Sequence, residues 1–147
     1  MKKDVLITLK SIYNDGNDNT ETELITDGVF SPVKGGFRIT YNETEVTGFA
    51  GEQTEITALG DDVVSIVRTG VSGTNLVIEK SRKHHCHYGT PYGDLMIGVY
   101  AKDIKNDLDS DGGNLYLRYT IDVNSSFVSD NEIYLNISAD NGAAGEI

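Results

Sequence analysis

Histidine and cysteine, the side chains that most often bind zinc, occur together in one short stretch of this chain. The segment KHHCHYG contains all three histidines and the only cysteine at four consecutive positions, 84 to 87. In an extended strand, residues i and i+2 share a face. We therefore expect His85 and His87 on one face and His84 and Cys86 on the other. Only the first pair could supply two ligands to one metal ion.

A native metal site is not the favoured interpretation of this cluster. A catalytic zinc ion needs three protein ligands, and the chain has no histidine or cysteine outside this window. Nucleophilic chemistry at Cys86 needs a base within hydrogen-bond distance, whereas adjacent histidines on a strand point away from it. We therefore predict no metal site, no cofactor and no catalytic residue here, and interpret the cluster as an exposed strand end that binds zinc or nickel only adventitiously.

A less conspicuous pattern places charges where apolar faces end. In FRITYNETE the apolar face that begins at Phe37 and includes Tyr41 continues by strict alternation into Glu43 and Glu45. In VVSIVR the apolar face continues in the same way into Arg68. Because a buried charge without a partner is costly, we expect Arg68 to pair with a glutamate.

These charges have two interpretations if the faces line a barrel. In the first, they form a mouth that fixes the polar head of a ligand by charge-assisted hydrogen bonds, above an apolar interior that holds its tail. In the second, they form a salt bridge that closes one end of a barrel filled by its own side chains. Barrels of about eight strands occur in both forms, so the sequence leaves both open.

The elements that must position these residues are strands, because apolar residues recur with period 2 between turns rich in Gly, Asn, Asp and Ser. The pattern predicts an all-β fold, a single antiparallel barrel of eight to ten strands with little or no helix. Residues 82–88 are expected to extend the strand before them, and residues 102–113 to form the longest polar connection. The expected strands cover about residues 5–10, 20–31, 35–46, 51–59, 61–69, 74–81, 93–102, 114–123 and 131–139.

The segment GTPYG, residues 89–93, is expected to form a sharp bend between two of these strands. Proline fixes one backbone dihedral and glycine accepts angles that other residues resist, which favours a barrel corner. A functional interpretation adds Tyr88 and Tyr92 as amphipathic side chains that lie across a cavity entrance.

The bulk composition limits the classes of partner and compartment. A chain of 147 residues fits one domain over residues 1–147, in which residues 140–147 are expected to be a frayed tail. The net charge of -11 repels nucleic-acid phosphate and anionic lipid, so we expect neither nucleic acid nor membrane as a partner. The lone cysteine and the absence of an apolar signal-like run predict a cytoplasmic protein.

A likeness to a known family lies in HYGTPYGDLMIGV, GNLYLRYTIDVNSS and NEIYLNIS, and upstream in YNETEVTG, GEQTEI and VRTG. These segments resemble those of the YwiB-like family, bacterial proteins of unknown function, and the likeness extends from about residue 28 to residue 138. The resemblance implies a calycin-type, lipocalin-like β-barrel and no established activity, and its pattern does not include the histidine and cysteine cluster. It falls on Tyr41, Glu43, Glu45, Gly48, Thr54, Arg68, Gly70, Tyr88, Thr90, Pro91, Tyr92, Gly93 and Tyr119.

Three hypotheses for function follow. The first is binding of a small, partly apolar ligand in the barrel, with polar contacts from Glu43 and Arg68 and a lining of Tyr41, Tyr88, Tyr92 and Tyr119. The second is a filled barrel that binds a protein partner, such as a second copy in a homodimer, through an edge strand or its acidic surface. The third is an enzyme that uses Glu43 or Glu45 as general acid or base. The volume of the interior separates these hypotheses.

Overall fold

The computed structural model describes residues 2–44, 50–70, 73–90 and 93–139. Glu45, Tyr92 and the predicted tail at residues 140–147 lie outside this part of the chain, as do Gly48 and Pro91. No helix in the described ranges is long and apolar enough to cross a membrane.

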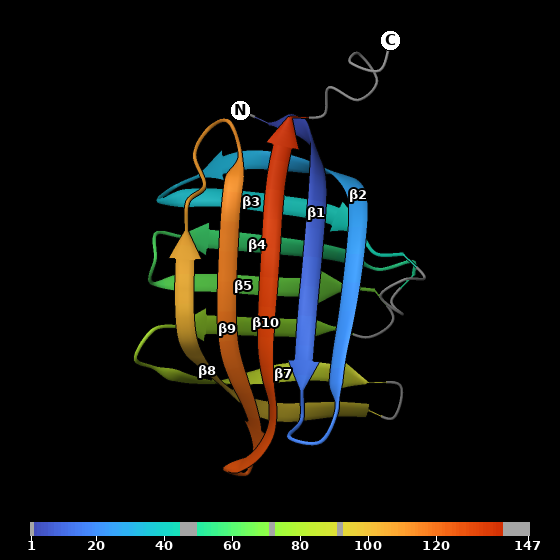
Figure 1. The fold of residues 1–147 in the computed structure, drawn as a ribbon, viewed down its shortest axis with the longest axis vertical. Coiled ribbons are helices and arrows are strands. Elements are labelled where there is room, and N and C mark those ends of the chain that lie inside the picture. Colours follow the sequence, from blue (N-terminus) through green and yellow to red (C-terminus); the bar gives the residue numbers. More distant parts are fainter. Residues whose placement is uncertain (1, 45–49, 71–72, 91–92, 140–147) are drawn as a thin grey trace.

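The described chain forms a single closed antiparallel barrel of ten strands, which confirms the predicted all-β fold (Figure 1). Each strand pairs with its neighbours in sequence, and β1 pairs with β10 to close the barrel. The strands are β1 (Lys3–Asn14), β2 (Asn19–Val33), β3 (Gly36–Asn42), β4 (Gln53–Leu59), β5 (Val63–Thr69), β6 (Thr74–Glu79), β7 (Lys83–Thr90), β8 (Gly93–Asn106), β9 (Gly113–Val123) and β10 (Ser126–Ala139).

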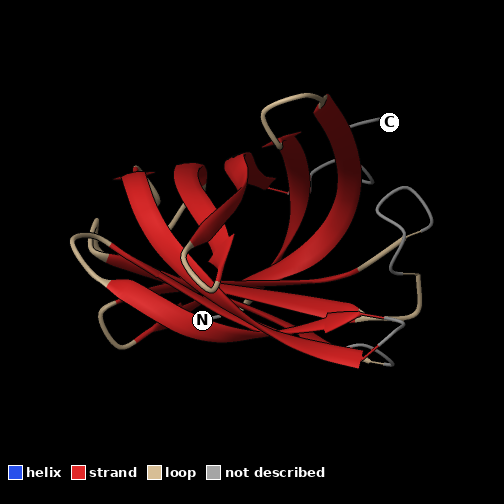
Figure 2. Ribbon diagram, turned by 90° about the horizontal axis from the view of Figure 1, so that it is seen from below, coloured by secondary structure: helices blue, strands red, loops and turns tan. Residues whose placement is uncertain are grey.

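The barrel is flattened into two layers whose strands cross at a steep angle. In Figure 1, β1, β9 and β10 run vertically in front of β3 to β7, which run across the molecule. The long strands β2 and β8 curve from one layer into the other, and Figure 2 shows the two layers from below. Such corner strands, which close two orthogonal layers into one sheet, leave space between the layers on one side.

Alternation along the strands builds the core between the layers. In β3 and β5, for example, Ile39 and Val64 are fully buried while their sequence neighbours are not. Burial of each such side chain contributes about 1.5–3 kcal/mol. The largest fully buried side chains are Phe30, Ile7, Ile39, Ile56, Ile78, Ile104, Leu115, Leu117, Leu135, Val5, Val64 and Val99.

Two predicted boundaries were wrong. Residues 82–88 do not extend the preceding strand, because the chain reverses near Ser81, which has a φ of 64°, and β7 is a separate strand. The expected polar connection at residues 102–113 is much shorter, because β8 continues to Asn106. β7 and β8 pair antiparallel as far as Thr90 and Gly93, and the residues between them, at the centre of the predicted bend at GTPYG, lie outside the described part of the chain.

Candidate functional site

One end of the barrel encloses a cavity of about 400 Å³. Its walls come from all ten strands, near the ends that the β1–β2, β3–β4, β5–β6, β7–β8 and β9–β10 connections join. The barrel interior is therefore not filled by its own side chains at this end. Five of the six residues predicted to contact a ligand line this cavity: Tyr41, Glu43, Arg68, Tyr88 and Tyr119. The sixth, Tyr92, lies outside the described residues.

A continuous row of polar side chains crosses one wall of the cavity. Tyr41 pairs with Thr54, Thr54 with Arg68, Arg68 with Thr74, and Thr74 with Tyr88, so these cross-strand neighbours step across β3 to β7. All five side chains line the cavity, and we call them the polar row. Because cross-strand partners on one face stand close together, the row concentrates hydroxyl groups and one guanidinium at the same depth of the barrel.

The next row into the barrel is entirely apolar. Ile39 pairs with Ile56, Ile56 with Ile66, and Ile66 with Leu76, and these four residues are called the apolar row. Three of them line the cavity, and Ile39 is fully buried behind them. The cavity is therefore layered: the apolar row forms its floor, and the polar row forms a rim directly above that floor. This arrangement suits a molecule with one apolar and one polar end.

The predicted pairing of Arg68 with a glutamate is present, and its partner is Glu43. The Nε atom of Arg68 lies 3.6 Å from Oε2 of Glu43, and the two side chains are 16% and 1% exposed. The hydroxyl of Thr54 donates a hydrogen bond to the same Oε2. Thr54 and Arg68 therefore both approach the same carboxylate oxygen of Glu43, and the three side chains form one polar cluster inside the barrel.

Two tyrosines place phenol groups beside this pair. Burial raises the pKa of Tyr41 well above its ordinary range, and the negative charge of Glu43 adds to this effect. Burial also raises the pKa of Tyr119 to about 12, although Arg68 opposes the shift. Both side chains are therefore neutral at physiological pH and retain a hydroxyl that can donate a hydrogen bond.

Sequence reasoning missed several buried polar groups at this end of the barrel, among them Glu52 and Thr74. Glu52 is 7% exposed and its Oε1 has no hydrogen-bond partner, and Thr74 is 5% exposed and its Oγ1 has none. In GEQTEI, strict alternation puts Glu52 and Thr54 on the same face as Ile56. This pattern could have predicted that Glu52 faces the interior. Thr74 gives no such signal, because it opens its strand and threonine is common on either face.

Apolar side chains surround the opening of the cavity. Tyr13, Leu95 and Val128 all line the cavity and are also exposed to solvent. On the opposite wall, the amide of Asn131 donates a hydrogen bond of 2.9 Å to the hydroxyl of Ser129, and both residues are buried. The opening of the cavity is thus bordered by exposed apolar and aromatic side chains, and the wall opposite the polar row also contains polar groups.

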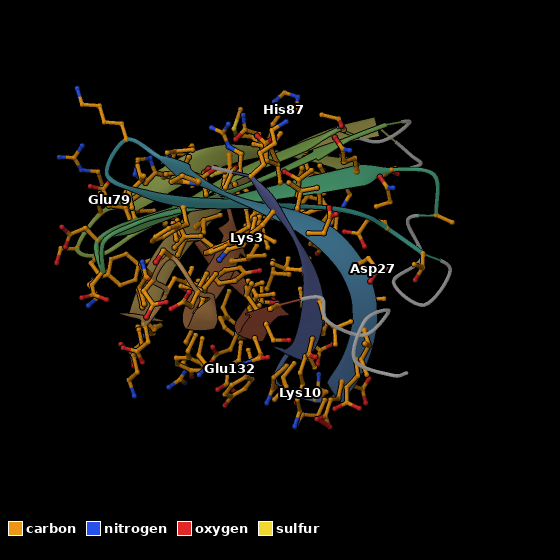
Figure 3. The ribbon with its side chains drawn as sticks, turned by 90° about the horizontal axis from the view of Figure 1, so that it is seen from above. Lys3, Lys10, Asp27, Glu79, His87 and Glu132 are labelled. Atoms are coloured by element: carbon orange, nitrogen blue, oxygen red, sulfur yellow. The ribbon has the colours of Figure 1, made fainter. Side chains whose placement is uncertain are left out.

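The histidine and cysteine cluster lies outside this cavity, and its side chains point alternately to the two faces of β7, as strand alternation predicts. Cys86 is buried, and its Sγ accepts a hydrogen bond from the Val77 N–H at 3.3 Å. His84 contacts Glu79, with 2.7 Å between Nε2 and Oε1. His85 and His87 are exposed on the outer face, where Figure 3 shows His87. No three histidine, cysteine, aspartate or glutamate side chains within the described ranges are grouped to hold a metal ion.

The fold and the cavity together define the class of protein: a closed ten-stranded antiparallel β-barrel with a layered internal cavity at one end. A family model covers most of the chain, residues 7–135, and the chain belongs to that family, which is described as a domain of unknown function (DUF1934).

The fold also matches a solved structure, that of the YwiB protein from Bacillus subtilis. The TM-score is 0.77 over 92% of both chains, with 18% sequence identity, which shows a shared fold. No curated protein matches the chain. The predicted resemblance to the YwiB-like family is thereby confirmed, and the family leaves the activity open.

Proposed function

We propose that this protein binds a small, partly apolar molecule in the barrel cavity. The layering of the cavity is the observation that carries the proposal: its polar row and the Glu43–Arg68 pair lie directly above the apolar row. The volume of about 400 Å³ falls within the range of about 300–1,000 Å³ that is usual for small-molecule sites. The apolar part of the ligand lies against the floor, and its polar part lies at the rim.

The buried hydroxyl of Thr74 supports the same proposal. It borders the cavity and has no hydrogen-bond partner. A buried polar group left unsatisfied costs about 1–3 kcal/mol, and a polar ligand atom at the rim removes that cost. Glu43 and Arg68 both border the cavity, so this pair offers a ligand a hydrogen-bond acceptor as well as a donor.

The two other hypotheses receive less support. A barrel filled by its own side chains does not account for a void of this size. An enzyme that uses Glu43 as acid or base requires a carboxylate that is available for proton transfer, but this one is engaged by Thr54 and Arg68. Glu45, the other carboxylate of that hypothesis, lies outside the described residues.

Binding of the uncharged fluorophore N-phenyl-1-naphthylamine tests the proposal. We expect saturable binding at one site per chain, with increased emission because the probe enters an apolar environment. The variant Ile66→Phe fills the cavity and should abolish binding, whereas Val67→Phe, the next residue on the same strand but outside the cavity, should leave it unchanged. No saturable binding, or equal binding to both variants, would refute the proposed site.

A further inference from the structure

Side chains at and next to the polar end of the cavity carry more negative than positive charge: Glu43 and Arg68 line the cavity, and Glu52 lies opposite Glu43 without lining it. Among the described residues whose side chains share the interior face at this end, Glu43 and Glu52 are acidic and Arg68 is basic. Two carboxylates against one guanidinium leave one negative charge in excess. Glu132 also borders the cavity, but two tyrosine hydroxyls donate to its carboxylate on the outer face, where Figure 3 shows it.

Cross-strand pairing places the two interior carboxylates opposite each other. The backbone N–H of Glu43 donates a hydrogen bond of 2.8 Å to the carbonyl of Glu52. Side chains of directly opposite residues begin about 4.5–5.5 Å apart, and like charges in such a pair destabilise each other. Arg68 lies beside Glu43 and neutralises it, so the unbalanced negative charge belongs to Glu52.

No ion pair joins Glu52 to a basic side chain in the part of the chain that the structure describes. Its side chain packs over Gly70, where an added Cβ would lie 2.4 Å from the Cγ of Glu52. It is nine-tenths buried, and its Oε1 has no hydrogen-bond partner in the described structure. A buried carboxylate without a countercharge is costly, so a positive charge brought into this end of the cavity is stabilised.

A second, independent group at the rim also suits a donor. The Oγ1 of Thr74, buried and without a hydrogen-bond partner, lies on a different strand from both glutamates and borders the cavity. A hydroxyl oxygen accepts hydrogen bonds readily from an ammonium group, which has three N–H donors and no acceptor. Tyr41, Tyr88 and Tyr119 line the same end, and aromatic rings attract cations.

On these grounds we infer that the ligand is an organic cation with an apolar body, such as an alkylammonium or arylammonium compound. This inference rests on the proposed function, since it assigns the chemistry of the ligand's polar end. The ammonium group lies at the polar row, where the negative charge of Glu43 and Glu52 together exceeds the positive charge of Arg68, and the apolar body lies against the apolar row. A carboxylate at this position would instead add a third negative charge. The net charge of -11 also draws cations toward the protein.

Calorimetric titration of the native protein with three ligands of equal chain length tests the inference at pH 7. The probes are octylammonium chloride, octan-1-ol and sodium octanoate. We expect octylammonium to bind roughly tenfold more tightly than octanol, and octanoate to bind most weakly. Octanol or octanoate binding as tightly as octylammonium would overturn the cationic assignment but retain the cavity site. Failure of all three to bind would overturn the proposed function as well.

The variant Glu52→Gln isolates the charge. It should weaken octylammonium binding by roughly tenfold and leave octanol binding unchanged, because the side-chain shape is kept. Glu55→Gln is the matched control, since Glu55 lies three residues further along, where it pairs with Arg38 on the outer face. Equal affinity of both variants for octylammonium would also overturn the assignment. The comparison of three probes on native protein decides the matter if Glu52→Gln does not fold.

Discussion

Arg68 is the residue on which the charges at the polar end of the cavity depend. It lies beside Glu43 and next to Thr54 and Thr74 in the cross-strand pairing, and Glu52 adds a second carboxylate nearby. Removal of a buried countercharge leaves a buried charge uncompensated, which costs far more than the loss of a surface ion pair. The stability of this end of the barrel therefore depends on one guanidinium.

Replacement of Arg68 by methionine tests this dependence. We expect the free energy of unfolding to fall by about 3 kcal/mol, because Glu43 and Glu52 then share the interior without a countercharge. Arg38→Met is the control, since Arg38 makes an exposed pair with Glu55 and should cost less than about 1 kcal/mol. Urea denaturation at pH 7 measures the free energy of unfolding of both variants. Equal losses would show that the interior Arg68–Glu43 pair contributes no more to stability than the exposed Arg38–Glu55 pair.

The buried phenol of Tyr119 predicts how stability changes at alkaline pH. Burial raises the pKa of this residue to about 12, so the folded state holds the phenol proton more tightly than the unfolded state does. The contribution of this raised pKa to the free energy of unfolding is fully present below about pH 10, and it is lost as the pH rises toward 12. We expect Tyr119→Phe to reduce the alkaline loss of unfolding free energy by about 2 kcal/mol, as measured by urea denaturation between pH 8 and pH 12. An unchanged pH profile would contradict burial of this phenol.

At the scale of strands, alternation predicted the site where the strands are regular. The period-2 pattern of FRITYNETE and VVSIVR placed Tyr41, Glu43 and Arg68 on the interior face, and all three line the cavity. The pattern failed where the backbone departs from period 2. In β8 the buried residues Ala101 and Ile104 are three apart, because the register shifts between Ala101 and Asp103, so the sequence there looked like a polar loop.

The boundary before β7 could not be predicted for a different reason. The chain reverses at Ser81, a residue type that rarely adopts a positive φ, so the usual glycine or asparagine signal is missing. The sequence of β7 is mostly polar. Among its described side chains, that of Cys86 is the one that is buried in the core. Pairing with β8 over the whole of β7, and with β6 at His87 and Tyr88, defines it as a strand.

Gly70 provides a test at this scale, because it ends the β5 wall of the cavity with a φ of +150°. An alanine there would be strained and its Cβ would overlap the side chain of Glu52, so we expect Gly70→Ala to cost about 1–3 kcal/mol. Gly73→Ala, in the same connection, meets nothing within 4 Å and should change stability by less than about 0.5 kcal/mol. Thermal unfolding followed by circular dichroism compares the two, and a harmless Gly70→Ala would contradict the close packing of Glu52 on β5.

At the scale of the whole molecule, the cavity is a consequence of how the barrel closes. Ten strands in simple sequential order form two crossed layers, and all ten contribute to the walls at one end. At the opposite end the rings of Phe30 and Phe37 stack 5.0 Å apart and border a smaller pocket of about 270 Å³. Because the sequence alone does not determine the separation of the layers, it left a hollow and a filled barrel equally open.

A crystal structure of the protein grown with octylammonium tests the layered cavity most directly. The polar and apolar rows predict the octyl chain against Ile56 and Ile66, with the ammonium nitrogen at the polar row. An interior occupied by the protein's own side chains, or an octyl chain bound only on the outer surface, would contradict this.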